Sequence, residues 1–454
     1  MTPSPRTLFA IICAGYLVLA SAYALLVPPW EAPDEPAHYL YAMQLATRGR
    51  PPLEPAVRQT SVFCRDYPYL SSNYEWFQPA LGYLPAALVY GILDAALPSL
   101  LPRVIPRLDP GFCPDRFAHA PLFLHPDRRL LHIWSGHWGL AIMRLCSSFL
   151  GLPVLYAAYR CGGLLDPGGR LGLAAAAWVA FLPQFTFVTA TVRSDSTANA
   201  LAALVFLFAA SMQVQTAGMR RLALGTGISL GLGLLSKFTF VSIVPVGLLA
   251  PLLARPRPPR AWLAGSLWVA CPTVAIPGLY YAAFPEARSA LAHMLGTTLR
   301  LRPDAFHWDY LAGIPSPLFI DLFFARFGWA NVAVPRALSL LAFALWGSGT
   351  MVTLVYLWRL RRCRQPAAAR ILAVLGLGIV LTAAGTLRFN LSEIQPQGRL
   401  LFPALVPWAL VTFAGLWHAT TPRSRALATL ASTVFMLGFN GYALLGVVVP
   451  AYYG

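Results

Sequence analysis

A chain of 454 residues would suggest two or three soluble domains, but 57% of its residues are hydrophobic, only 11% are charged and its mean hydropathy is +0.60, values that exclude an ordinary globular protein. The formal net charge of +17 does not indicate a nucleic-acid partner, because the arginines form short clusters between apolar runs and no aromatic stacking surface accompanies them. Apolar runs long enough to cross ~30 Å of hydrocarbon recur along the chain, so the sequence predicts an all-α polytopic integral membrane protein.

The first apolar run, residues 7–27, is predicted to be an uncleaved transmembrane helix. Ala20-Ser21-Ala22 resembles a signal-cleavage site, but the apolar run continues beyond it to Val27. Basic clusters fall on alternate connections between the later runs, which places the N-terminus in the cytoplasm and the C-terminus outside. Every acid except Asp166 then lies on the outer side. About eleven spans are expected, at residues 7–27, 138–158, 171–190, 198–216, 222–236, 238–254, 261–283, 336–358, 370–387, 399–417 and 426–449.

Two outer connections are too long to be simple linkers. The first, residues 28–137, contains the apolar stretch 80–101, which we expect to form a helix lying along or dipping into the membrane interface. It also contains Cys64 and Cys113, which could form a disulfide outside the cytoplasm or remain free thiols. The second, residues 284–335, is rich in Trp and Tyr, as is typical of the headgroup level. With these two loops, we expect residues 1–454 to form a single transmembrane domain.

Three acids and a histidine follow the first span immediately. Glu31, Asp34 and Glu35 fall within five residues, and His38 comes three residues later. Carboxylates at the mouth of a membrane span are costly to keep near hydrocarbon, which favours a functional role over a solvated loop start. Two carboxylates as close as Asp34 and Glu35 should push one pKa upward, and a raised pKa suits a general base.

Further polar residues fall on the same predicted face. Gln78 stands before Pro79 in the first loop. Arg193 and Asp195 precede an apolar run, where Asp195 could equally be a helix cap. Lys237, the only lysine of the chain, lies at a tight turn between two apolar runs. Snorkelling of its side chain to the interface would explain Lys237 equally well.

The last block of this kind is Gln397-Gly398-Arg399, at the start of the predicted span 399–417. An interfacial anchor would also explain Arg399. Its place on the same face as the first-loop acids makes it a candidate partner for them.

In their order along nearly the whole chain, these blocks resemble the GT-C superfamily of membrane glycosyltransferases, and more closely a largely uncharacterised bacterial branch grouped with it. The resemblance rests on the Asp-Glu-Pro-Ala-His block 34–38 and on Gln78-Pro79, Phe327-Gly328-Trp329 and Gln397-Gly398-Arg399. One departure is the segment 80–83, where that branch has a second proline and paired aromatic residues. The resemblance implies a GT-C-like fold.

It also implies a transferase of the bacterial inner membrane that takes a sugar from a polyprenyl-phosphate-linked donor at the extracytoplasmic face. The acceptor would be a hydroxyl of a glycan, a lipid or a protein. A carboxylate could take the acceptor's proton, and we expect Asp34 to be the general base and Glu35 to orient it or the acceptor. The leaving lipid phosphate needs cations, for which Arg399 and Lys237 are the candidates. The expected substrate-binding residues are His38, Gln78, Arg193, Asp195, Lys237, Gln397 and Arg399.

No cofactor and no metal are expected. The chain has no glycine-rich nucleotide-binding motif, and its remaining histidines lack metal-ligand spacing. The leading alternative is a transporter or flippase for a lipid-linked or acidic substrate, which would need ionisable residues near mid-membrane. The expected spans hold almost none of these, apart from Arg144 and Lys237 at a turn. A purely structural subunit would leave the outer-face acids and bases without a purpose.

Overall fold

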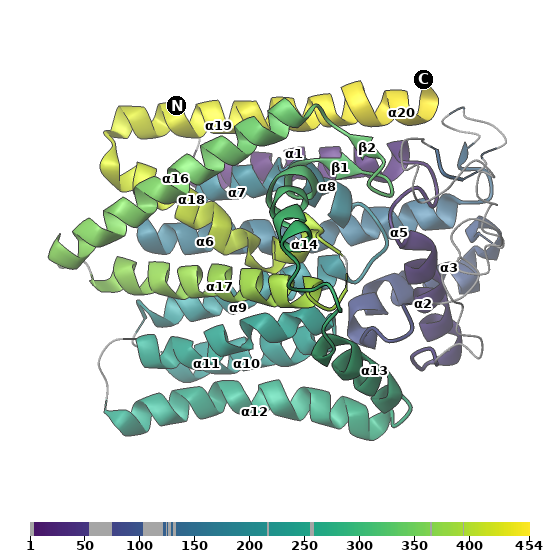
Figure 1. The fold of residues 1–454 in the computed structure, drawn as a ribbon, viewed down its shortest axis with the longest axis horizontal. Helices are drawn as coiled ribbons and strands as arrows, with labels where there is room; N and C mark the ends of the chain where they lie inside the picture. Colours follow the sequence, from purple (N-terminus) through teal and green to yellow (C-terminus); the bar gives the residue numbers. More distant parts are fainter. Residues whose placement is uncertain are drawn as a thin grey trace.

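Most of the long helices run side by side along the horizontal direction of Figure 1. The computed structural model describes residues 4–53, 75–102, 121–123, 125, 129, 133–215, 218–254, 258–363, 366–393 and 395–454.

The α-helices are α1 (Pro5–Leu26), α2 (Glu35–Arg48), α3 (Leu84–Ala96), α5 (Trp138–Ser148), α6 (Leu152–Leu165), α7 (Arg170–Ala180), α8 (Pro183–Thr189), α9 (Asp195–Met212), α10 (Met219–Leu234), α11 (Val244–Leu253), α12 (Pro259–Ala283), α13 (Ala287–Leu299), α14 (Trp308–Gly313), α15 (Leu322–Phe324), α16 (Arg336–Cys363), α17 (Pro366–Asn390), α18 (Leu405–Ala419), α19 (Pro422–Tyr442) and α20 (Val449–Tyr453). Shorter 3₁₀ and π segments are η1 (Ala80–Tyr83), η2 (Pro98–Leu100), η4 (Phe149–Gly151), η5 (Phe238–Ile243), η6 (Pro317–Asp321), η7 (Gly398–Ala404) and η8 (Ala443–Val448).

Among the described residues, eight helices are long and apolar enough to cross a membrane, and the bent pair α7–α8 makes a ninth if it counts as one span. The prediction of a polytopic α-helical membrane protein is therefore confirmed. The sequence assignment also counted residues 222–236 and 238–254 as spans. These residues form α10 and the apolar segment Phe238–Leu253, which consists of η5 and α11, and both are shorter than the eight long helices. The total of about eleven spans stays a prediction.

The start of α1 shows how the local sequence sets a helix boundary. The Ser4 side chain accepts a hydrogen bond from the Thr7 backbone N–H at 3.2 Å, and Pro5 occupies the first helical position, where its missing N–H costs nothing. The helix ends before Pro28-Pro29, because a residue followed by proline disfavours helical backbone. The acidic block of the first loop therefore begins directly where the span finishes.

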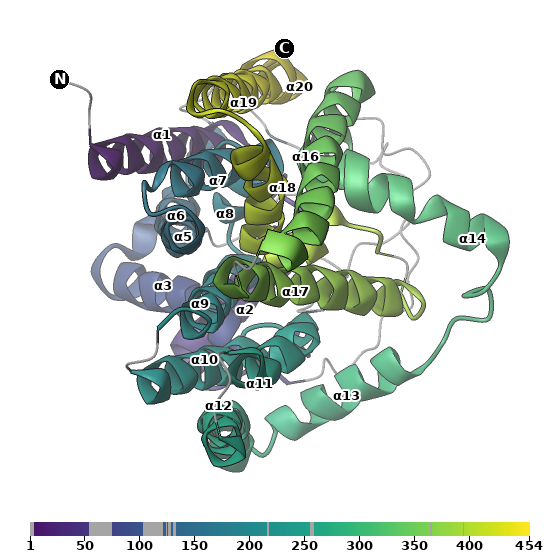
Figure 2. The same ribbon diagram turned by 90° about the vertical axis from the view of Figure 1, so that its left-hand side faces the viewer.

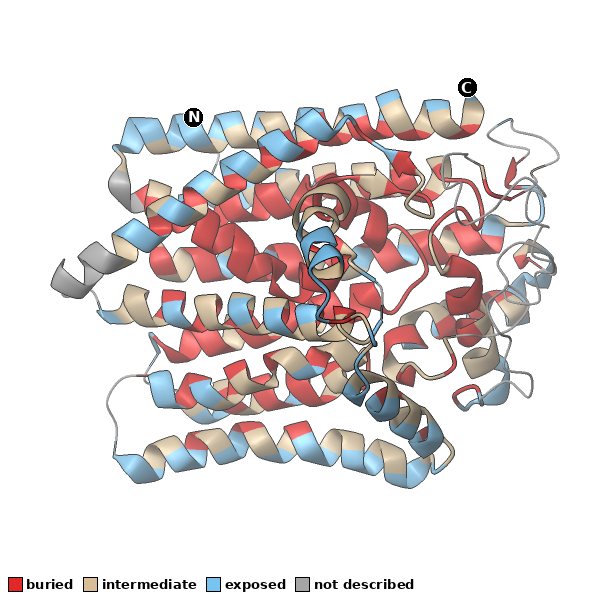
Figure 3. Ribbon diagram, in the orientation of Figure 1, coloured by how far each residue is buried: buried red, intermediate tan, exposed pale blue. Residues whose placement is uncertain are grey.

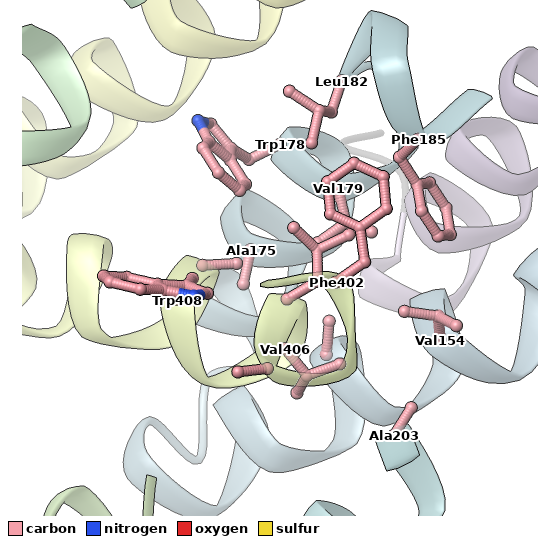
Figure 4. Close-up of a cluster of buried hydrophobic side chains, with 14 of the residues drawn as sticks. Val154, Ala175, Trp178, Val179, Leu182, Phe185, Ala203, Phe402, Val406 and Trp408 are labelled. Carbon is pink, nitrogen blue, oxygen red and sulfur yellow. The ribbon is translucent and has the colours of Figure 1, made fainter. Parts of the chain in front are cut away.

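The core of the bundle lies where α6, α7, α9 and α18 meet (Figures 3 and 4). In the η7–α18 segment, 94% of the residues in the apolar window are buried, whereas in α12 the share is only 17%. Trp178, Phe402 and Trp408 belong to the buried cluster of Figure 4. Peripheral helices such as α12 and α19 expose apolar faces, as expected of surfaces that contact lipid.

Close approach of α6 and α7 depends on two glycines. A Cβ atom added at Gly162 would lie 2.3 Å from the Cα atom of Gly172, and one added at Gly172 would lie 2.2 Å from the carbonyl oxygen of Tyr159. Small residues allow helix backbones in membranes to pack at such short range. The two helices can therefore touch only because both positions lack a side chain.

Both long connections emerge at one end of the bundle. The first-loop helices α2 and α3 lie at the right of Figure 1, where the C-terminus also lies, and α12 ends on that side before α13 begins. Figure 2 shows α13 and α14 at the outside of the bundle, away from α1 and α7. The predicted helix within residues 80–101 forms as η1, α3 and η2. A two-stranded antiparallel hairpin of β1 (Arg326–Phe327) and β2 (Val332–Ala333) completes the second loop.

The cysteines add no cross-link among the described residues, where Cys13, Cys146, Cys161 and Cys271 are free thiols. Cys64 and Cys113 lie outside the described residues. The disulfide considered between them therefore stays a prediction.

Candidate active site

A cavity of about 220 Å³ lies between the start of α2, the first turn of α9, the α10–η5 turn, α13 and the start of η7. Residues from widely separated parts of the sequence meet in it. Six of the predicted site residues line this cavity together: Asp34, His38, Gln78, Asp195, Lys237 and Arg399.

Asp34 forms an ion pair with Arg399 in the lining of the cavity. It is the residue before α2, its backbone is left-handed with φ 63° and ψ 0°, and its Oδ2 accepts a hydrogen bond from Nη2 of Arg399 at 2.8 Å. Burial raises the pKa of Asp34, but the charges of Arg399 and Arg193 outweigh burial and lower the pKa to about 2. Asp34 is therefore ionised at any physiological pH.

A second ion pair joins Lys237 to Asp195. Nζ of Lys237 lies 2.5 Å from Oδ1 of Asp195, and the side chains are only 13% and 5% exposed. Lys237 thus points to a protein carboxylate and not to the membrane interface. Asp195 is the first residue of α9, and the preceding Ser194 makes no side-chain capping bond. Both alternatives considered from the sequence, snorkelling and capping, are replaced by this ion pair.

Arg399 has donors left over after its bond to Asp34. Its Nε and Nη1 atoms are buried and have no hydrogen-bond partner among the described residues. A buried guanidinium with unused donors is costly unless an acceptor can approach it. Arg399 therefore keeps two unused donor nitrogens, of the kind that bind anionic groups.

Glu75 is a cavity residue that the sequence analysis did not single out. It lies three residues before Gln78, and its Oε2 atom is shielded from solvent with no hydrogen-bond partner among the described residues. Burial and then the negative charge of Asp34 raise the pKa of Glu75 to about 7, against the opposing charges of Lys237 and Arg399. An acid close to a predicted substrate-binding residue was the one sequence signal that could have identified it.

His38 lies near Asp34 and Glu75 and contacts a buried tyrosine. Its Nδ1 atom lies 2.9 Å from the hydroxyl of Tyr83, which stacks on Tyr41 with ring centroids 3.9 Å apart. Burial, with the nearby charge of Arg193, lowers the pKa of His38 to about 3. The imidazole is therefore neutral at physiological pH and can donate one hydrogen bond while accepting another.

No family model and no curated protein sequence matches this chain. Three solved structures are similar to it over most of its length. ArnT from Cupriavidus metallidurans bound to undecaprenyl phosphate is 14% identical with a TM-score of 0.51, over 93% of this chain and 62% of that one. Arabinofuranosyltransferase AftD from Mycobacteria is 16% identical with a TM-score of 0.51, over 99% and 27%. Archaeal oligosaccharyltransferase AglB from Archaeoglobus fulgidus, in complex with an inhibitory peptide and a dolichol-phosphate, is 13% identical with a TM-score of 0.50, over 97% and 56%.

All three are membrane glycosyltransferases of the GT-C superfamily. The chain has the GT-C fold. The predicted resemblance to that superfamily is thereby confirmed at the level of the fold. The chain spans less than two thirds of the length of each of the three proteins, at 62%, 27% and 56%.

Within the GT-C fold of this chain, Glu35 faces away from the cavity. Its two oxygens accept hydrogen bonds from Nε and Nη2 of Arg144 at 2.8 and 2.5 Å, and both side chains are fully buried. Glu35 therefore does not line the cavity, and its charge is matched by Arg144, so its expected role in orienting Asp34 or the acceptor stays a prediction. The sequence predicted a raised pKa for one carboxyl of the Asp34-Glu35 pair; the pKa of Asp34 is instead lowered, and the raised pKa belongs to Glu75, where the charge of Asp34 contributes to it.

Replacing Arg144 with alanine is expected to lower the free energy of unfolding by about 3–5 kcal/mol, because removing one partner of a buried ion pair leaves the other charge uncompensated. The change also removes donors to the backbone carbonyls of Val27 and Pro28. Denaturant unfolding in detergent measures the effect. Arg160→Ala is the control, since Arg160 is exposed in the same span and should alter stability by less than about 0.5 kcal/mol. A similar small change for Arg144→Ala would contradict the prediction.

Two predicted substrate-binding residues do not reach the cavity. Nη2 of Arg193 donates to the backbone carbonyl of Pro33 at 2.5 Å, and Arg193 lines a separate cavity of about 20 Å³. Gln397 stands before η7, and Gln395 lines the main cavity in its place. The chain turns between these two glutamines, because the backbone N–H of Gln397 bonds to the carbonyl of Gln395 at 2.7 Å.

Asp34, His38 and Glu75 could also hold a metal ion, since one ligand atom of each lies within 4.8 Å of the others. Carboxylate and imidazole groups suit divalent cations. The Arg399 guanidinium competes for the same Asp34 carboxylate. The sequence predicted no metal site on the ground of histidine spacing, and Glu75, which lies far along the chain from the other two residues, was not considered.

Proposed function

We propose that this protein is a glycosyltransferase that moves a sugar from a polyprenyl-phosphate-linked donor to an acceptor hydroxyl. The observation that carries the proposal is the cavity in which the carboxylates of Asp34 and Glu75 lie opposite the cations of Arg399 and Lys237. The GT-C fold supports it, because two of the similar structures contain undecaprenyl phosphate and a dolichol-phosphate.

Arg399 and Lys237 are proposed to bind the phosphate of the donor. Arg399 offers two buried N–H donors, and charge-assisted bonds to phosphate are about twice as strong as neutral ones. Asp34 and Asp195 hold the two cations in place before the donor arrives. Cations fixed in this way can stabilise the charge that develops on the leaving phosphate without further reorganisation.

Glu75 is proposed to accept the proton of the acceptor hydroxyl. A base with a pKa near the working pH is more effective than one whose pKa is far below it. The pKa of Glu75 is raised to about 7, whereas that of Asp34 is lowered to about 2. The sequence favoured Asp34 as the base; we assign Asp34 to fixing Arg399 and to keeping a negative charge beside the reacting sugar.

At the anomeric carbon, the reaction forms one bond and breaks one. The acceptor oxygen attacks the anomeric carbon of the sugar as the bond between that carbon and the phosphate oxygen breaks. The hydroxyl proton passes to Glu75, and the electron pair of the broken bond leaves with the polyprenyl phosphate, whose charge rests on Arg399 and Lys237. Loss of the proton from Glu75 to water restores the starting state.

We further propose that the site faces the extracytoplasmic side of a bacterial inner membrane, with the N-terminus in the cytoplasm. The cavity residues come from segments at the end of the bundle where the two long loops emerge (Figure 1). The clusters Arg220-Arg221 and Arg423 to Arg425 lie where α10 and α19 begin, at the other end of the bundle. The positive-inside rule assigns such clusters to the cytoplasm.

A reconstituted system tests this function against the alternative of a transporter or flippase. Proteoliposomes would contain undecaprenyl phosphate linked to radiolabelled hexoses or pentoses, with a solubilised cell-envelope fraction as acceptor. A transferase moves the label into the acceptor and releases undecaprenyl phosphate. A flippase leaves the label on the lipid and changes only the leaflet in which it lies. Label that stays on the lipid for every donor in the panel would contradict the proposal.

A further inference from the structure

The loop that carries Asp34 has an unusual backbone. Trp30 and Asp34 both have left-handed conformations, with φ of 72° and 63°, and neither is glycine. Left-handed backbone costs a non-glycine residue roughly 1–2 kcal/mol, so surrounding contacts must hold it in place. The position of the Asp34 carboxylate therefore depends on what holds residues 28–34.

Side chains from three distant elements hold this loop by its carbonyl groups. Arg144 donates to the carbonyl of Pro28 at 3.0 Å, and Arg193 donates to that of Pro33 at 2.5 Å. Between them, the indole Nε1 of Trp329 donates to the carbonyl of Trp30 at 3.1 Å. Of the three, Trp329 alone binds one of the two left-handed residues directly.

Trp329 is itself held rigidly by the β1–β2 hairpin. Phe327 is fully buried and contacts the rings of Tyr23 and Phe187, with centroids 5.6 and 5.3 Å away. Gly328 has a φ of 59°, and a Cβ atom there would lie 2.2 Å from Oδ1 of Asn331. Ala330 is also left-handed, and its carbonyl accepts a hydrogen bond from Nε of Arg326 at 2.7 Å. These contacts hold the Phe-Gly-Trp block in one conformation, in which Trp329 reaches the backbone of Trp30.

We propose that Trp329 is a positioning residue that sets the place of Asp34 by holding Trp30 in its left-handed conformation. This inference rests on the proposed glycosyl transfer. It explains the Phe327-Gly328-Trp329 block, which lies far from Asp34 in the sequence and does not line the cavity. Trp329 touches the backbone of the loop and not the reacting groups.

Trp329→Phe tests the proposal, because phenylalanine keeps the ring but removes the N–H donor. We expect kcat to fall about tenfold while the KM for the donor and the affinity for undecaprenyl phosphate stay within about twofold, since small misplacements of reacting groups slow the chemical step. Trp308→Phe is the matched control. Trp308 belongs to the same long loop, is 78% exposed and should leave both constants unchanged.

Trp329→His is a second variant that keeps a ring N–H in a smaller side chain. Its kcat is expected to lie between those of Trp329→Phe and the wild-type protein. Wild-type kcat in a folded Trp329→Phe protein would overturn the inference, and so would a raised KM with unchanged kcat. If neither variant folds, Trp329 serves folding and the inference is equally overturned. Failure of the wild-type protein to transfer any sugar would count instead against the proposed function.

Discussion

Replacing Arg399 with alanine is expected to weaken binding of undecaprenyl phosphate on the order of 10²-fold or more and to abolish measurable sugar transfer. Truncating one member of a buried, hydrogen-bonded charge pair costs roughly 2–5 kcal/mol, and each 1.4 kcal/mol is a factor of ten in affinity. The change removes the two unused donors of Arg399 and also leaves the carboxylate of Asp34 without its ion-pair partner. The unbalanced negative charge of Asp34 would then repel the incoming phosphate.

A double variant separates the two parts of this effect. Arg399→Ala with Asp34→Asn removes the repulsion as well as the guanidinium, so it is expected to bind undecaprenyl phosphate more tightly than Arg399→Ala alone. Arg302→Ala is the control, because Arg302 pairs with Asp304 outside the cavity. Binding of the radiolabelled lipid in detergent gives the affinities. Unchanged affinity in the Arg399→Ala protein would contradict the assignment of Arg399 to the donor phosphate.

The helical architecture could be predicted because hydrocarbon leaves few alternatives. Backbone groups within a bilayer must be satisfied inside each segment, so a long apolar run predicts a helix almost directly. The turn at Lys237 was also predictable, since a single charge divides the run 222–254 into two short pieces. The assignment of those two pieces as spans stays a prediction, because α10 and Phe238–Leu253 are both near the minimum length.

The candidate site could be predicted only in part, for a reason that Glu35 illustrates. Asp34 and Glu35 are neighbours in the chain, and the sequence assigned them to one site. Asp34 pairs with Arg399, which is 365 residues away, and Glu35 pairs with Arg144, which is 109 residues away. A carboxylate's partner decides its role, and partners at such separations are set by tertiary packing. Glu75 was missed for the same reason, because its raised pKa arises from burial and from Asp34.

Replacing Glu75 with glutamine is expected to lower the rate of sugar transfer by about 10²- to 10⁴-fold, the usual contribution of a general base. Donor affinity should change little, because the donor phosphate is proposed to bind Arg399 and Lys237. Glu75 must be deprotonated to act, and its pKa is raised to about 7. In the wild-type protein, kcat/KM should therefore be low at acidic pH, rise through about pH 7 and level off above it. The glutamine variant should lose this dependence on pH.

Asp34→Asn provides the decisive comparison between the two carboxylates. The negative charge of Asp34 contributes to the raised pKa of Glu75. Removing that charge should lower the pKa of Glu75, so the rise in kcat/KM should move to a lower pH but remain visible. Glu286→Gln, outside the cavity, should leave the profile unchanged. If the rise persists in Glu75→Gln and disappears in Asp34→Asn, then Asp34 is the proton acceptor and the assignment to Glu75 is wrong.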